Sequence, residues 1–208
     1  ISGVPPTEIV IIGSDKIAQS AALTATKLGA RVKVFSNSIF KLDKIQKLIG
    51  TPIYSSTIQK KQLSKALMRC DVAIGTIKSN TNSDAIISED MIVNMKKGAI
   101  IIDVSIDTGG TFQTSKLTNH DKPTFVKHDV IHYCVPNIPS RYSRTSSLCL
   151  SNIITPYLVK SVKFGSFENF IRNNNSFKKG VYLYNGLNTN KIINQILNIK
   201  YNDITTII

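Results

Sequence analysis

Between Thr7 and about Asn137, short runs of β-branched and apolar residues alternate with longer segments in which apolar residues recur at helical spacing. This alternation is typical of βαβ units, which place parallel strands in one sheet and helices on its faces. Strands are expected at residues 8–12, 32–35, 53–55, 72–74, 99–104, 125–127 and 131–135, and helices at 16–28, 39–48 and 59–68. A further short helix, capped by Ser88, is expected to contain Met91, Ile92 and Met95. The pattern predicts an α/β fold with a Rossmann-like doubly wound parallel sheet.

The segment 99–104 reads AIIIDV, an apolar run without alternation. Such a run is typical of an interior parallel strand, so we expect it to be buried on both faces. It leads directly into two carboxylates, Asp103 and Asp107, and the pair Gly109-Gly110. Ligands of open α/β sheets bind outside the carboxyl ends of the strands, so an acid here stands where chemistry is expected. The alternative is a solvated loop acid beside a glycine turn.

The pattern changes after Pro139. Helices are expected at residues 145–160, 167–172 and 192–197, with Pro156 bending the first, and Asn185-Gly186 predicts a turn. This part of the chain holds too few apolar residues for a core of its own, so we expect it to dock on another surface. The predicted organisation is a Rossmann-type domain over residues 1–144 and a carboxyl-terminal helical extension over residues 145–208.

The sequence GSDKIA at residues 13–18 has the position and length of a dinucleotide-binding turn between a strand and a helix. Gly13 takes the first glycine position and Ala18 is acceptable at the third. Asp15 replaces the middle glycine, where a carboxylate would repel a pyrophosphate. The acid that should bind ribose hydroxyls at the end of the second strand is replaced by Ser36. A strand–helix junction that binds nothing is the alternative.

The charge, the apolar runs and the cysteine and histidine spacing indicate which kinds of partner the chain is expected to lack. The net charge is +13, but the lysines are scattered and form no block interleaved with aromatic residues, so no nucleic-acid partner is expected. No apolar run approaches the roughly 20 residues of a membrane span. The three cysteines have no CxxC spacing and the three histidines no metal-ligand spacing, so no metal site is expected. These features predict a cytoplasmic protein without a membrane partner.

Three continuous segments resemble a known family: MKKGAIIIDVSIDTGGTFQTS at 95–115, TNHDKPTF at 118–125 and VIHYCVPNIPSRYSRTSSLCLSNIITPYL at 130–158. They are similar to the alanine dehydrogenases, within the alanine dehydrogenase and pyridine nucleotide transhydrogenase group. Asp107 resembles the dehydrogenase pattern, because the transhydrogenase pattern carries an amide residue there.

This resemblance implies an NAD-dependent enzyme that oxidatively deaminates L-alanine to pyruvate and ammonium, and a homo-oligomer. Asp107 corresponds to the active-site aspartate beside the nicotinamide and the substrate. The positions that correspond to cofactor-binding residues are Gly13, Lys16, Ile17, Ser36, Lys41, Thr76, Ile77, Asn137 and Ile138. The family's substrate-gripping residues lie in an amino-terminal domain that precedes this segment, and residues 145–208 resemble the part that returns to pack on it.

Two other functions stay open at this stage. Asp15 and Ser36 favour a degenerate, non-catalytic Rossmann scaffold. The second alternative is the NAD-binding part of a transhydrogenase alpha-type subunit, which Asp107 disfavours.

Overall fold

The computed structural model describes residues 3–78 and 85–208. The chain divides into two compact units, Ile1–Arg141 and Tyr142–Ile208, which we call unit 1 and unit 2 and describe separately. The division falls immediately before the long helix α5 (Ser143–Val162), so the expected boundary after residue 144 lies within the first turn of that helix.

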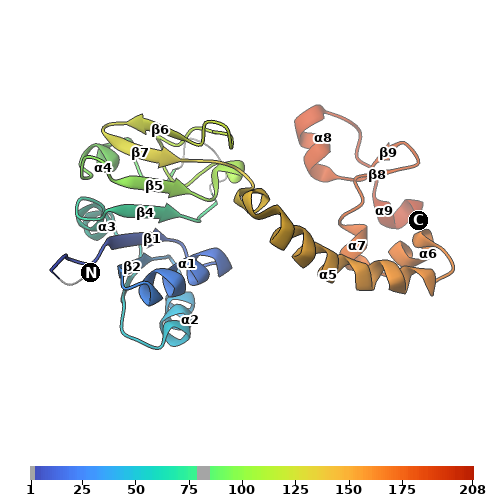
Figure 1. The fold of residues 1–208 in the computed structure, drawn as a ribbon. Helices are drawn as coiled ribbons and strands as arrows, with labels where there is room; N and C mark the ends of the chain where they lie inside the picture. Colours follow the sequence, from blue (N-terminus) through green and yellow to red (C-terminus); the bar gives the residue numbers. More distant parts are fainter. Residues whose placement is uncertain (1–2, 79–84) are drawn as a thin grey trace. The chain divides into compact units, whose positions relative to one another are not determined.

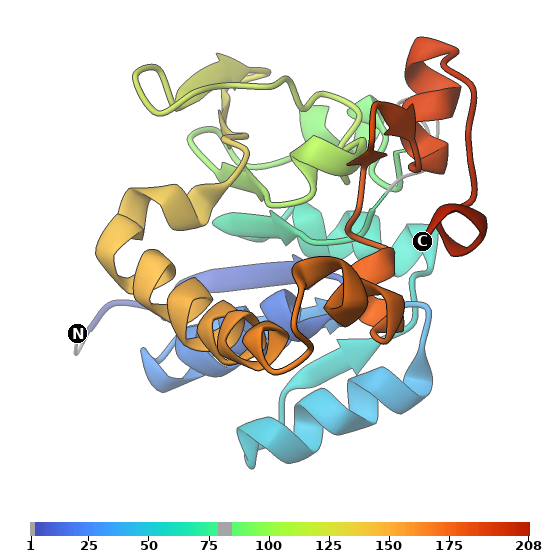
Figure 2. The ribbon, with the colours of Figure 1, turned by 90° about the vertical axis from the view of Figure 1, so that its right-hand side faces the viewer.

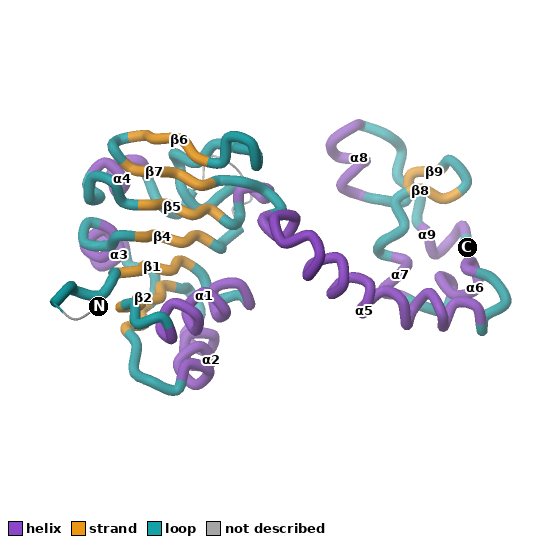
Figure 3. The backbone as a smooth tube through the Cα atoms, in the orientation of Figure 1, coloured by secondary structure: helices purple, strands orange, loops and turns teal. Residues whose placement is uncertain are grey.

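Unit 1 contains a seven-stranded sheet in the order β3-β2-β1-β4-β5-β7-β6 (Figures 1 and 3). Its strands are β1 (Glu8–Ile12), β2 (Arg31–Phe35), β3 (Tyr54–Ser56), β4 (Val72–Gly75), β5 (Ile100–Asp103), β6 (Thr124–Lys127) and β7 (Val130–Tyr133). All pairings are parallel except that of β6 with β7. The predicted doubly wound α/β fold is confirmed.

Helices cover both faces of the sheet: α1 (Lys16–Lys27), α2 (Ile39–Ile49), α3 (Lys60–Leu67) and α4 (Glu89–Val93). Alternation along β1 explains the two layers. Ile11 packs with the α1 and α2 side chains, whereas Val10 and Ile12 pack with those of α3 and α4. Figure 2 shows α2 beside β3, the edge strand that follows it in the chain. The small residues Ala18 and Ala22 of α1 are fully buried, which lets this helix lie close to the sheet.

Side chains cap the first two helices of unit 1. The side chains of Asp15 and Ser38 accept hydrogen bonds from backbone N–H groups in the first turns of α1 and α2. Ser88 precedes α4 as expected, but its hydroxyl makes no capping bond. The Gln113 side chain accepts from the N–H of Glu89, the first residue of α4, at 2.8 Å. Helix α4 also ends at Val93, so the expected inclusion of Met95 was wrong.

The expectation that segment 99–104 is buried on both faces was also wrong. Ile101 and Asp103 are fully buried, but Ile100 is 36% exposed and Ile102 is half-buried. The reason is the connection after β5. It is a loop with a short 3-10 helix, η2 (Ile106–Thr108), and it leads to the antiparallel strand β6 instead of to a covering helix.

Asp103 anchors this loop. Its Oδ1 accepts hydrogen bonds from the Ser105 N–H and hydroxyl, at 3.1 and 2.9 Å. Its Oδ2 accepts from the N–H groups of Thr111 and Phe112, at 2.9 and 3.3 Å, and from the Ser115 hydroxyl at 2.6 Å. The carboxylate is fully buried, so these five donors replace its water shell. The acid at the tip of β5 is therefore structural.

His132 on β7 is buried in a neutral form. A carbonyl oxygen only accepts, so the 3.0 Å contact to the Val130 oxygen places a proton on Nδ1, and Nε2 accepts from the Thr114 hydroxyl at 2.7 Å. The Phe125 ring stacks on the imidazole with centroids 4.8 Å apart. Burial lowers the pKa of His132 below its ordinary 6.5, because the charged form would lose its hydration.

Unit 2 consists of α5, α6 (Phe167–Arg172), α7 (Asn175–Lys178), the hairpin β8 (Leu183–Tyr184) and β9 (Leu187–Asn188), α8 (Lys191–Leu197) and α9 (Ile204–Ile207). Its apolar interior is small: the buried Phe170 ring contacts the rings of Phe164, Phe167 and Phe177. Asn185 and Gly186 both have positive φ, so the predicted turn is confirmed. Among the described residues, no helix is long and apolar enough to cross a membrane.

Removal of the Asp103 carboxylate is expected to destabilise the chain strongly. Asp103→Ala leaves buried N–H and O–H donors unpaired and should lower the free energy of unfolding by about 3–5 kcal/mol. Asp107→Ala is the matched control, because Asp107 is exposed and makes no hydrogen bond or ion pair to another described residue; its effect should stay within about 0.5 kcal/mol. Urea denaturation followed by circular dichroism measures both, and equal effects would show that Asp103 is no anchor.

The buried neutral His132 predicts a pH-dependent stability. Because the pKa of His132 is lowered in the folded state, the unfolded chain binds a proton at this residue at a higher pH than the folded chain does. The contribution of His132 to the free energy of unfolding is therefore fully present above pH 6.5, and it is lost as the pH falls towards the lowered pKa. The loss is at most about 1.4 kcal/mol per pH unit. Urea midpoints between pH 7.5 and 5.5 should show this slope in the wild type and in the control His120→Gln, and a smaller slope in His132→Gln. A slope unchanged in His132→Gln would contradict the assignment.

Candidate functional site

A pocket of about 330 Å³ lies at the carboxyl ends of β1, β2 and β4. It is lined by Gly13, Ser14, Asp15, Ser36, Asn37, Ser38, Lys41, Thr76, Ile77 and Lys78. Five of the predicted cofactor-binding residues are in this set: Gly13, Ser36, Lys41, Thr76 and Ile77. The strand order reverses between β1 and β4, so the pocket occupies the topological switch point of the sheet, where ligands of doubly wound folds bind.

Gly13 is required by the close approach of two strand ends. Its φ is +136°, and a Cβ added there would stand 2.0 Å from the Thr76 Oγ1. The Gly13 N–H donates to the Phe35 carbonyl at 2.8 Å, and the Thr76 N–H donates to the Ile12 carbonyl at 2.9 Å. Only a glycine lets β1, β2 and β4 end at one point without displacing Thr76.

Asp15 holds the turn that follows. Its Oδ1 accepts from the Ala18 N–H at 2.9 Å, so the carboxylate caps α1. A carboxylate at a helix N-terminus is stabilised by the helix dipole, which would otherwise attract a phosphate. The N–H groups of Lys16 and Ile17 make no hydrogen bond to any described residue. Two donors at the start of α1 therefore remain for a ligand, beside a negative charge.

Ser36 is not an isolated substitute for the missing acid. Its hydroxyl lies 2.6 Å from the Ser14 hydroxyl, and both residues are buried. The Ser36 oxygen also accepts from the Ser38 N–H at 3.3 Å. The two hydroxyls carry two protons, and their mutual hydrogen bond uses one, so the pair can donate one further hydrogen bond but offers no charge.

The charges that line the pocket are one acid and two bases. Asp15 is the acid, and Lys41 and Lys78 are the bases. Both lysines are exposed and neither forms an ion pair with a described residue. Lys41 comes from the first turn of α2, whereas Lys78 follows β4.

The five remaining predicted residues do not line this pocket: Lys16 and Ile17, which begin α1, and Asp107, Asn137 and Ile138. Asp107 lies on η2 after β5, and it is exposed. Asn137 follows β7 with a φ of +52°, and Ile138 begins the 3-10 helix η3 (Ile138–Tyr142). The Asn137 carbonyl accepts from the N–H and hydroxyl of Ser140, at 3.0 and 2.9 Å. Because β4, β5 and β7 are parallel neighbours, these residues stand further along the same edge of the sheet.

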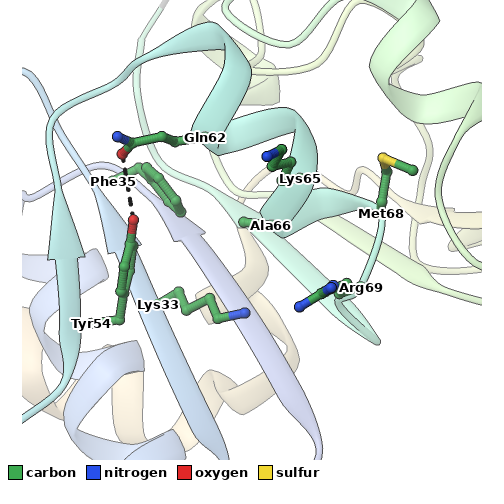
Figure 4. Close-up of a pocket in the computed structure, with 8 residues that line it drawn as sticks. All are labelled: Lys33, Phe35, Tyr54, Gln62, Lys65, Ala66, Met68 and Arg69. Carbon is green, nitrogen blue, oxygen red and sulfur yellow. Dashed lines mark hydrogen bonds between the residues drawn. The ribbon is translucent and has the colours of Figure 1, made fainter.

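A second hollow, of about 570 Å³, lies between α3 and the strands β2 and β3 (Figure 4). The Tyr54 hydroxyl donates to the Gln62 Oε1 across it at 3.4 Å. Lys33 reaches it from β2, but its Nζ is paired with Glu8 at 3.0 Å. The lining includes none of the predicted site residues, so the pocket at the switch point is the candidate site.

Sequence reasoning missed four lining residues: Ser14, Asn37, Ser38 and Lys78. Ser38 also caps α2. Ser14 lies inside the predicted turn and could have been found by its position between Gly13 and Asp15. Nothing in the sequence signals that Ser14 pairs with Ser36, because the two are 22 residues apart.

Comparisons with known proteins support the Rossmann-like fold described above. Residues 1–191 match the family described as "Alanine dehydrogenase/PNT, C-terminal domain". Alanine dehydrogenase 2 of Staphylococcus aureus (strain USA300) is 33% identical over 206 residues, which cover 98% of this chain and 55% of the relative. A solved L-alanine dehydrogenase structure superposes with a TM-score of 0.85 at 26% identity, covering 95% of this chain and 55% of that one. A transhydrogenase structure from Sinorhizobium meliloti has a TM-score of 0.65 at 18% identity, over 81% of this chain and 47% of that one, which supports the fold alone.

The chain thus spans about half the length, 55%, of the curated relatives that it matches. The family match includes the turn at Gly13, the pocket, the Asp103 anchor and most of unit 2. The chain belongs to the alanine dehydrogenase/PNT C-terminal domain family.

Proposed function

We propose that unit 1 binds a nicotinamide dinucleotide, with NAD the form that the family resemblance implies, in the pocket at the switch point. The observation that carries this proposal is the meeting of the β1, β2 and β4 ends around Gly13, with free N–H donors at the start of α1. The residues present fit the group. The Lys16 and Ile17 N–H groups would bind the pyrophosphate, and the Ser14–Ser36 pair would donate to a ribose oxygen.

We further propose that the chain is the dinucleotide-binding part of an alanine-dehydrogenase-like oxidoreductase. The bound dinucleotide would supply hydride transfer. Asp107 would hold the substrate ammonium or orient the attacking water, because it is exposed at the same edge of the sheet and has no partner among the described residues. Asn137 and Ile138 would flank the nicotinamide side, from the end of β7.

The proposed substrate pair is L-alanine and pyruvate. The relatives' names carry this assignment, together with the acid at position 107. The groups that grip the substrate would come from a region outside this chain, and the proposed assembly is a homo-oligomer in the cytoplasm.

One observation favours a second candidate, a non-catalytic scaffold. Asp15 already occupies the Ala18 N–H and places a negative charge beside the pyrophosphate donors. This candidate predicts that no dinucleotide binds at millimolar concentration.

Asp15 is expected to weaken dinucleotide binding by repulsion. Asp15→Asn keeps an oxygen that can cap α1 and removes the charge, so it should tighten NADH binding by about tenfold, the effect of about 1.4 kcal/mol. The matched control is Asp121→Asn on an exposed loop, which should leave the dissociation constant unchanged. Isothermal titration calorimetry measures the NADH dissociation constant of the wild type and of both variants. No binding by any of them would favour the scaffold, and unchanged affinity in Asp15→Asn would remove the repulsion argument.

Asp107 is expected to be needed for turnover but not for cofactor binding. We expect alanine-dependent NAD reduction when the chain is combined with the amino-terminal half of a related alanine dehydrogenase, and at least a roughly hundredfold loss of kcat in Asp107→Asn. The NADH dissociation constant should stay within about twofold, because Asp107 lies outside the pocket. Absence of turnover in the combined protein, with NADH bound, would contradict the dehydrogenase proposal and leave the binding proposal standing.

A further inference from the structure

The pocket lacks the feature that selects the unphosphorylated ribose of NAD. In such sites an acid at the end of the second strand accepts hydrogen bonds from the ribose hydroxyls and repels a phosphate. Here the residue after β2 is Ser36, and residues 36–41 read SNSIFK, without any acid. The next acid, Asp43, is outside the pocket lining and pairs with Lys47 at 2.8 Å.

From this we infer that the pocket accommodates a 2′-phosphate on the adenosine ribose, so that the chain prefers NADP(H) to NAD(H). The inference rests on the proposed dinucleotide site and concerns only which form of the nucleotide it takes. It replaces NAD as the preferred form.

Lys41 provides the charge for such a phosphate. It reaches the pocket from the first turn of α2, directly after the loop that carries Ser36. Its ammonium group has no ion pair with a described residue, so it is available to a phosphate. Lys78, on the loop after β4, adds a second cation to the lining, and it has no ion pair with a described residue.

Neutral donors complete the set. Helix α2 has 11 residues, and the N–H groups of Ile39 and Phe40 in its first turn make no hydrogen bond to a described residue. Its positive pole therefore faces the loop at Ser36 without a counter-charge. The Ser14–Ser36 pair retains one hydroxyl proton to donate. A cation, a helix start and hydroxyls together match the chemistry of a phosphate monoester.

Asp15 does not decide between the two nucleotides. Its carboxylate is held at the start of α1 by the Ala18 N–H, beside the donors proposed for the pyrophosphate. Both nucleotides carry the same pyrophosphate, so the repulsion weakens both alike. The difference in affinity comes from the groups around Ser36 and Lys41.

The test compares the binding of NADPH and NADH to the whole chain by isothermal titration calorimetry at low salt. Wild type should bind NADPH at least about tenfold more tightly, the effect of one charge-assisted hydrogen bond. Lys41→Ala should bring the ratio close to one, because it should weaken NADPH binding much more than NADH binding, and Ser36→Asp should reverse it. Lys65→Ala, an exposed lysine at the hollow beside α3, is the matched control and should keep the wild-type ratio.

The outcomes separate the two proposals. Equal affinities, or tighter NADH binding, in the wild type would overturn the inference and leave the dinucleotide site standing. A ratio that Lys41→Ala does not change would overturn it as well, and this exposed substitution does not depend on whether Ser36→Asp folds. Binding of neither nucleotide would refute the proposed function, and the inference with it.

Discussion

The edge of unit 1 that carries the candidate site depends on the burial of one carboxylate. Asp103 lies at the end of β5 with no exposed surface and five donors around it, which bends the chain back from Ser105 to Ser115. The Thr111 held in this way donates its hydroxyl proton to the Ile77 carbonyl at 3.0 Å. One buried charge thus connects the loop that presents Asp107 to the loop that lines the pocket.

Much of this fold could be predicted from the sequence, because local chemistry and tertiary packing agree there. Strand β1 and the starts of α1 and α2 lie at the residues that the apolar pattern predicts. The errors occur where tertiary context decides. The Ser88 hydroxyl makes no capping bond, and the first N–H of α4, that of Glu89, is bound by the side chain of Gln113, 24 residues away in the chain. Ile100 looked like a core residue because the run AIIIDV does not show whether a helix covers each face.

The candidate site was predictable in outline but not in its chemistry. The turn at Gly13 and the ends of β2 and β4 follow from the order of elements, so Thr76 and Ser36 could be assigned to the same edge. The role of Asp103 could not, because a sequence does not distinguish a buried acid with five donors from an exposed one. Asp107, four residues later, has the same side chain and the opposite environment.

The capping contact of Asp15 changes the charge that a ligand meets at the start of α1. In a turn with a middle glycine, an arriving phosphate would be the first anion at the helix pole. Here the protein supplies its own anion, held by the Ala18 N–H at 2.9 Å. A phosphate that binds the Lys16 and Ile17 N–H groups would therefore share the pole of α1 with a carboxylate that stays in place, so the helix stays neutralised at this end with or without a ligand.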